Sequence, residues 1–200
     1  YLKTYYPKEF IAASMTMDIS NQNKLSEFYE ELKRLNIDVV RPDINECFAD
    51  FRTENGKFYY ALGGIKAVGY EAVSNIVNER ENNGKFKSFS DFINRVDSKD
   101  VNKLQLEGLT KAGAFDELNE DRAKIYNSIP KIIQKIKNIN DDKTNNQSSL
   151  FGNSENQDNE FEFAPSSSWK QKEVLSEEFK SLGFIFLITR LMNIKIYSIN

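Results

Sequence analysis

The segment ALGGIKAVGYEAVSNIVNER, residues 61–80, places a turn of small residues directly before a run with helical periodicity. The turn is IKAVG, residues 65–69, and it carries one lysine. Apolar residues follow it at helical spacing, at Ala72, Val73, Ile76 and Val77. This pattern predicts two helices that are joined by a tight hairpin and held together by their apolar faces.

A hairpin of this kind has a defined chemistry when it faces a nucleic acid. Small residues let backbone N–H groups approach a phosphate, and the next helix adds its unpaired donors and its positive dipole end. Such a contact is made to the phosphate backbone, so it does not depend on base sequence. The candidate DNA-binding residues are Lys66, Ala67, Val68, Gly69 and Tyr70. The structural alternative is that Gly63, Gly64 and Gly69 only mark a helix start.

A second turn of small residues occurs in KAGAF, residues 111–115. It could be a degenerate second hairpin, formed by Lys111, Ala112 and Gly113. A turn of this kind is more often an ordinary helix end, with Gly113 as the left-handed residue that closes the helix.

Composition excludes several classes of protein. The chain has 200 residues, 40% of them hydrophobic, so it can bury one moderate core or two small ones. It has no histidine, and its single Cys47 cannot form an internal disulfide, which excludes the usual zinc sets and every histidine-based triad. No stretch approaches the roughly 20 apolar residues that cross a bilayer, and we expect a cytoplasmic protein. The start at Tyr1, within what reads as mid-domain sequence, suggests a piece of a longer protein.

The net charge of −3 argues against a general polyanion binder. Only residues 51–115 and 166–200 carry a slight excess of basic side chains. The acidic pair Asp141-Asp142 has no third ligand nearby in the sequence, so we interpret it as part of a solvated loop rather than a metal site.

Periodicity and capping residues predict a mostly α fold. Pro7 suits a first helical turn, and Asn21 or Asn23 can cap the next helix. A short strand, IDVV, precedes Pro42, and residues 57–137 are predicted to be helical with short breaks. Within them, Ser88 and Asp91 resemble a capping box, and a last helix is kinked or restarted at Pro130.

Residues 138–168 are rich in Asn, Asp, Ser and Gln, and they cannot bury enough apolar surface to offset the entropy of ordering. We predict a flexible linker here, followed by a helix that begins at Trp169 and packs on its own domain.

Several segments follow one another in an order that is specific to a known family. The chain resembles the alpha subunits of bacterial DNA polymerase III, the C-family replicative polymerases, from residue 1 to about 184. The segments that carry this resemblance are YLKTYYPKEFIAASMT, RPDINECFADF, ALGGIKAVGYEAV, FKSFSDFINRVD, VNKLQLEGLTKAGAFDEL, QSSLFG and WKQKEVLSEEFKSLGF.

The resemblance implies a domain order. Residues 1–54 are then the end of a fingers domain, 55–137 a tandem helix-hairpin-helix domain that binds duplex DNA, and 138–168 a disordered linker. Residues 169–184 lead toward an oligonucleotide-binding barrel. The family usually has glycine where Ala67 stands, and the added methyl group could crowd the phosphate.

The linker of the family carries a peptide that binds the sliding clamp, and Gln147, Leu150 and Phe151 match its pattern. The alternative is a chance Leu-Phe pair in a polar tract. The implied partners are primer-template duplex DNA, the sliding clamp and other subunits of the polymerase III holoenzyme. Catalysis in the family uses three aspartates that hold Mg²⁺ in a palm domain, and none of the carboxylates here matches that motif. We therefore expect no catalytic or metal-binding residue here, and a fragment that is inactive alone.

A protein of another class is the alternative to this interpretation, namely a stand-alone helix-hairpin-helix module that packs on a protein partner.

The tail, residues 185–200, departs from the family pattern, and one inserted base after the Phe184 codon can restore that pattern. We therefore interpret the tail as frameshifted, and we expect apolar side chains such as Ile185 and Phe186 to lack an evolved partner surface.

Overall fold

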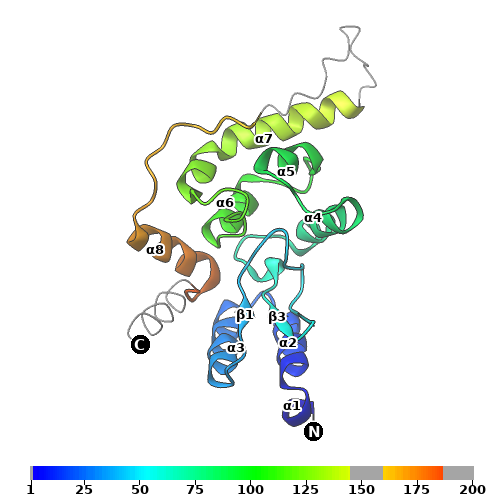
Figure 1. Cartoon of the computed structure of the whole chain (residues 1–200), viewed down its shortest axis with the longest axis vertical. Helices are drawn as coiled ribbons and strands as arrows, with labels where there is room; N and C mark the ends of the chain where they lie inside the picture. The colour runs from blue at the N-terminus through cyan, green and yellow to red at the C-terminus, as the bar shows by residue number, and fades with distance from the viewer. Residues whose placement is uncertain (1, 145–159, 187–200) are drawn as a thin grey trace.

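The computed structural model describes residues 2–144 and 160–186. Figure 1 shows helices throughout, with a small sheet near the N-terminal helices and α8 beside the helices that follow the sheet. The prediction of a mostly α fold is confirmed. One apolar core joins the N-terminal helices, the sheet and the later helices.

The chain begins with α1 (Leu2–Tyr5), α2 (Pro7–Met17) and α3 (Gln22–Arg34). Proline occupies the first turn of α2, where its missing N–H costs nothing. The side chain of Asn21 accepts a hydrogen bond from the Lys24 N–H at 3.2 Å, so the predicted cap of α3 is confirmed.

Three short strands form a sheet in the order β1-β3-β2. They are β1 (Val39–Val40), β2 (Arg52–Glu54) and β3 (Lys57–Tyr59), with β1 parallel and β2 antiparallel to β3. Our prediction of helix from residue 57 is wrong here. The turn between β2 and β3 is Asn55-Gly56, and both residues have positive φ, 51° and 77°. A two-residue turn with this sequence favours a hairpin of strands.

The helices that follow are η1 (Leu62–Gly64), α4 (Tyr70–Asn83), α5 (Phe89–Arg95), α6 (Lys103–Lys111) and α7 (Arg122–Thr144). At the start of α5 the Ser88 hydroxyl accepts from the Asp91 N–H, as predicted. The Asp91 carboxylate accepts from the Lys87 N–H instead of the Ser88 N–H, so the capping box is incomplete. A complete one occurs at α6, between Asn102 and Gln105.

Helix α7 runs through Pro130 as one helix, so of the two predicted alternatives, a kink or a restart, the restart is wrong. The helix ends at Thr144 instead of residue 137. The far end of the predicted linker is also ordered. Phe161 is buried at 3% exposure, 6.3 Å from the ring of Phe89, and the Ala164 N–H donates to Ser128. Residues 138–144 and 160–168 are therefore not flexible linker, because one part continues a helix and the other packs on α5 and α7. The clamp-peptide residues Gln147, Leu150 and Phe151 lie outside the described residues.

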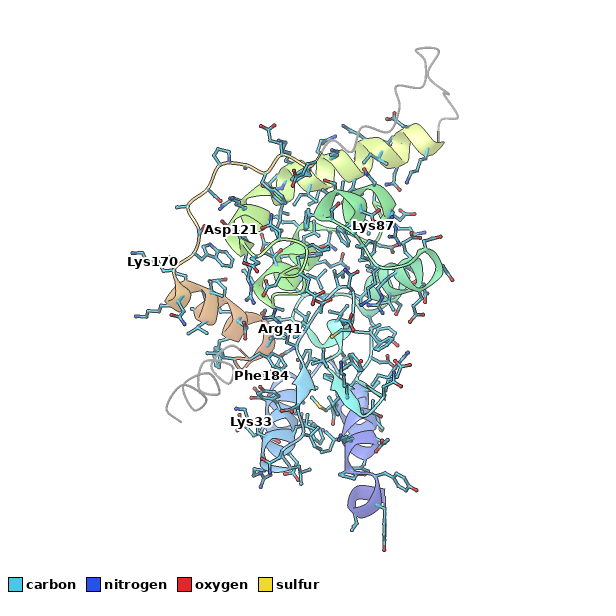
Figure 2. All side chains as sticks on the ribbon, in the orientation of Figure 1. Lys33, Arg41, Lys87, Asp121, Lys170 and Phe184 are labelled. Carbon is cyan, nitrogen blue, oxygen red and sulfur yellow. The ribbon has the colours of Figure 1, made fainter. Side chains whose placement is uncertain are left out.

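The last helix, α8 (Gln171–Leu182), begins two residues after Trp169, whose ring lies 5.4 Å from that of Tyr126. Beyond α8 the chain returns to α3, where Phe184 (labelled in Figure 2) stacks on Tyr29 at 3.9 Å. Phe186 also packs there, 5.0 Å from Tyr29, so our expectation that Phe186 lacks a partner surface is wrong. Residues 187–200 of the tail lie outside the described residues.

Candidate nucleic-acid interface

The turn before α4 is a tight hairpin with two buried anchors. Ile65 and Val68 are 2% and 8% exposed, whereas Lys66, Ala67 and Gly69 face solvent. The Val68 N–H donates to the Ile65 carbonyl at 3.1 Å and closes the turn. The anchors hold the backbone in place, and the residues between and after them remain accessible to a ligand.

Ala67 has a left-handed backbone, with φ of 66°. This conformation costs an L-residue roughly 1–2 kcal/mol, and glycine adopts it readily. The hairpin therefore keeps a shape that favours glycine even though alanine occupies the position.

Some backbone donors of the hairpin are paired within the protein and others are not, since the N–H groups of Lys66 and Val68 donate to Ser181 and Ile65. Within the described ranges, no carbonyl or side chain accepts from the N–H groups of Ala67, Gly69 and Tyr70. Gly69 is the cap residue of α4 and has no side chain to satisfy the first turn, and the Val73 N–H is the first to find a partner, the Gly69 carbonyl. Free donors at the positive end of a helix form a ready anion site. Glu71 is the one acidic side chain in the first turn of α4.

Two contacts from distant parts of the chain position the hairpin, and sequence reasoning missed both. A Cβ at Gly108 would lie 2.7 Å from the Lys66 carbonyl oxygen, so only glycine lets α6 approach this closely. On the other side, the Lys66 N–H donates to the Ser181 carbonyl of α8 at 2.9 Å. The helical glycine in α6 was a detectable signal, since glycine inside a helix usually has a packing reason.

The two glycines of η1 serve packing. A Cβ at Gly63 would lie 2.7 Å from the Ala49 carbonyl, and one at Gly64 would lie 3.1 Å from the ring of Phe51. The structural alternative therefore accounts for these two residues, whereas Gly69 lies at the exposed start of α4.

The second turn has different surroundings. Gly113 has φ of 80° and closes α6 as the left-handed residue, but both Ala112 and Gly113 are buried. A Cβ at Gly113 would lie 2.2 Å from the Arg122 guanidinium, which also donates to the Lys111 carbonyl at 2.9 Å. Gly113 therefore does not share a surface with the first hairpin. The Lys111 side chain does, because it lines the same hollow as Lys66 and Ala67.

Arg122 is 5% exposed and is held by two carboxylates. It lies 2.7 Å from Asp116 and 3.2 Å from Glu178, which is itself 1% exposed. Burial lowers the pKa of Arg122, but the hydrogen bond to Asp116 and both negative charges outweigh it and leave the pKa raised. The second turn thus encloses a permanent positive charge of the protein itself.

Other shifted groups have structural roles. Burial raises the pKa of Asp43 to about 6, against the lowering effect of hydrogen bonds from the Asn45 and Glu46 N–H groups. Asp43 thereby caps the turn that precedes Cys47.

Within residues 2–144 and 160–186, no group of three or more Cys, Asp and Glu residues could hold a metal ion. None of the described helices is long and apolar enough to cross a membrane.

Comparison with known proteins adds identity to this geometry. A family model described as "Helix-hairpin-helix motif" matches residues 36–125. The DNA polymerase III subunit alpha of Borreliella burgdorferi is 41% identical over 187 residues, and that of Caulobacter vibrioides is 39% identical over 184 residues. Each alignment covers 92% of this chain and 16% of the relative. The corresponding subunit of Chlamydia trachomatis is 46% identical over 125 residues, which are 62% of this chain and 10% of the relative.

The chain thus spans 16% of the length of the Borreliella and Caulobacter relatives, and the matched family model includes the exposed hairpin. The chain is therefore a homologue of one segment of the bacterial DNA polymerase III alpha subunit.

Proposed function

We propose that the chain supplies duplex DNA binding, without base preference, as one segment of a replicative DNA polymerase. The observation that carries the proposal is the exposed hairpin with free backbone donors at Ala67, Gly69 and Tyr70, beside Lys66. Homology to subunits named DNA polymerase III subunit alpha supports the same assignment.

The proposed contact is made to one phosphate of the DNA backbone. The N–H groups of the hairpin and the first turn of α4 donate to its oxygens, and the Lys66 ammonium adds a point charge. The contact positions the duplex and reads no bases. In this proposal, primer-template DNA is the ligand, and magnesium-dependent nucleotide transfer belongs to other parts of the polymerase.

The salt dependence of binding tests this proposal. Phosphate contacts make the logarithm of the binding constant fall with the logarithm of salt concentration, with a slope of about −0.9 for each contact. The full chain should bind two duplexes of unrelated sequence with equal affinity and equal slope. Lys66→Ala should make the slope less negative by about one. Lys33→Ala, on α3, should leave the slope unchanged. Absence of binding at low salt would instead favour a module that packs on a protein.

We also propose that Gln147, Leu150 and Phe151 tether the polymerase to its sliding clamp. The side chains of Leu150 and Phe151 fill a hydrophobic pocket of the clamp, and burying each one contributes about 1.5–3 kcal/mol to binding. The amide of Gln147 fixes the register of the peptide by hydrogen bonding. Replacing both Leu150 and Phe151 with Ala should abolish clamp binding and leave helical content and duplex affinity unchanged. Unchanged clamp affinity in the double variant would refute the motif.

A further inference from the structure

A hollow lies beside the hairpin, between α6 and α8. Three lysines from three elements line it: Lys66 of the hairpin, Lys111 of α6 and Lys180 of α8. Ala67 lines the same hollow, so the left-handed residue of the hairpin and the two further ammonium groups share one surface.

Two interactions in the last turns of α8 hold this helix against the hairpin and the start of α7. The Ser181 carbonyl accepts from the Lys66 N–H at 2.9 Å, and the buried Glu178 pairs with Arg122 at 3.2 Å. Residue 180 lies between these two anchors, so the backbone that carries the Lys180 side chain is fixed relative to the hairpin.

The lysines of the hollow exceed the acidic groups that face them. Lys111 and Lys180 share a single carboxylate, Glu177, at 3.2 and 2.5 Å. Glu107 also lines the hollow, and it lies 3.8 Å from a further lysine, Lys103. Within the described residues, no carboxylate lies within ion-pair distance of Lys66. The hollow therefore keeps a positive charge that internal pairing does not cancel.

Glu177 stays ionised in this setting. Burial acts to raise its pKa, but the hydrogen bonds from Lys180 and Lys111 outweigh burial and leave the pKa below its ordinary value. This carboxylate does not itself line the hollow, and its single negative charge pairs with both ammonium groups without neutralising both.

We propose that Lys180 and Lys111 bind a second backbone phosphate of duplex DNA beside the one at the hairpin, which makes α8 part of the DNA-binding surface. The inference rests on the proposed function of the hairpin and extends DNA binding to α8, which follows the proposed clamp-binding residues in the sequence. Ammonium groups bind phosphate as point charges, so the added contact is also independent of base sequence.

The test compares single variants of the full chain in duplex titrations at several salt concentrations. Lys180 has an exposed side chain (61%), so Lys180→Ala removes a charge without opening the core. We expect it to reduce the salt slope by about one. Lys172→Ala is the matched control, because Lys172 is an exposed lysine of the same helix that does not line the hollow. It should leave the slope unchanged.

The outcomes separate this inference from the proposed function. A reduced slope for Lys180→Ala, with Lys172→Ala at the wild-type value, supports the inference. If Lys66→Ala reduces the slope while Lys180→Ala matches Lys172→Ala, the inference is overturned and the hairpin assignment stands. If the unaltered chain fails to bind duplex at low salt, the proposed function fails and this inference fails with it.

Discussion

The turns at residues 65–69 and 111–115 have similar sequences, IKAVG and KAGAF, and contrasting surroundings. In the first, Lys66, Ala67 and Gly69 are exposed, and the N–H groups of Ala67 and Gly69 meet no acceptor in the described part of the chain. The second is buried and closes around the Arg122 guanidinium, which donates to the Lys111 carbonyl. Each turn contains one left-handed residue, Ala67 in the first and Gly113 in the second.

The difference teaches that a turn of small residues permits close approach but does not decide what approaches. In the second turn the approaching group is a cation of the protein itself, and it stabilises the fold. In the first turn the backbone presents the donors of Ala67 and Gly69, and we propose that an external anion accepts from them. The variants that follow test this division of roles.

The largest expected effect comes from removing the cation of the second turn. Arg122→Met removes the buried cation that pairs with Asp116 and Glu178, and breaking a buried ion pair on one side costs about 3–5 kcal/mol. Urea denaturation should show this loss of unfolding free energy. Arg34→Met, which removes a largely exposed guanidinium from α3, is the control and should change stability by less than about 1 kcal/mol. A loss as small as that of the control would show that Arg122 does not hold the second turn.

A smaller loss is expected when the second turn is crowded. Gly113→Ala imposes a left-handed alanine and places a Cβ 2.2 Å from the guanidinium, for a cost of about 2–3 kcal/mol. Gly183→Ala is matched, since Gly183 is also left-handed just after a helix but its nearest atoms would lie at 3.8 Å. It should cost only about 1–2 kcal/mol. Equal losses in the two variants would mean that Arg122 exerts no steric demand on Gly113.

The smallest effect has the opposite sign and concerns the first turn. Ala67→Gly relieves the left-handed alanine and should stabilise the chain by up to about 1 kcal/mol, while also tightening duplex binding. Thermal denaturation and duplex titration measure the two effects. Ala72→Gly, within α4, should instead destabilise by about 0.5–1 kcal/mol. Weaker DNA binding by Ala67→Gly would contradict the idea that the methyl group crowds the phosphate.

Sequence reasoning succeeded where the signal is local. The Asn21 cap, the proline in the first turn of α2, the left-handed Gly113 and the position of the first hairpin all depend on a few adjacent residues. Asn55-Gly56 is also a strong local signal for the hairpin of β2 and β3, although helical periodicity predicts a helix from residue 57.

The remaining features depend on residues that lie far apart in the chain. Nothing near Arg122 in the sequence indicates that it pairs with Glu178, and nothing near Lys66 indicates that Ser181 accepts its N–H. Composition predicts that the whole polar tract is a flexible linker, but Phe161 within it packs against the ring of Phe89 in the tertiary fold. Pairings of this kind are set by packing rather than by local preference.

The most direct test of the central claim is amide NMR of the full chain during titration with short duplex DNA at low salt. We predict that the amide resonances of Ala67, Gly69 and Tyr70 shift with DNA concentration, because their N–H groups donate to phosphate. The amides of Gly113 and Ala114 should stay unchanged. Shifts confined to the second turn, or no shift at the first, would contradict the account.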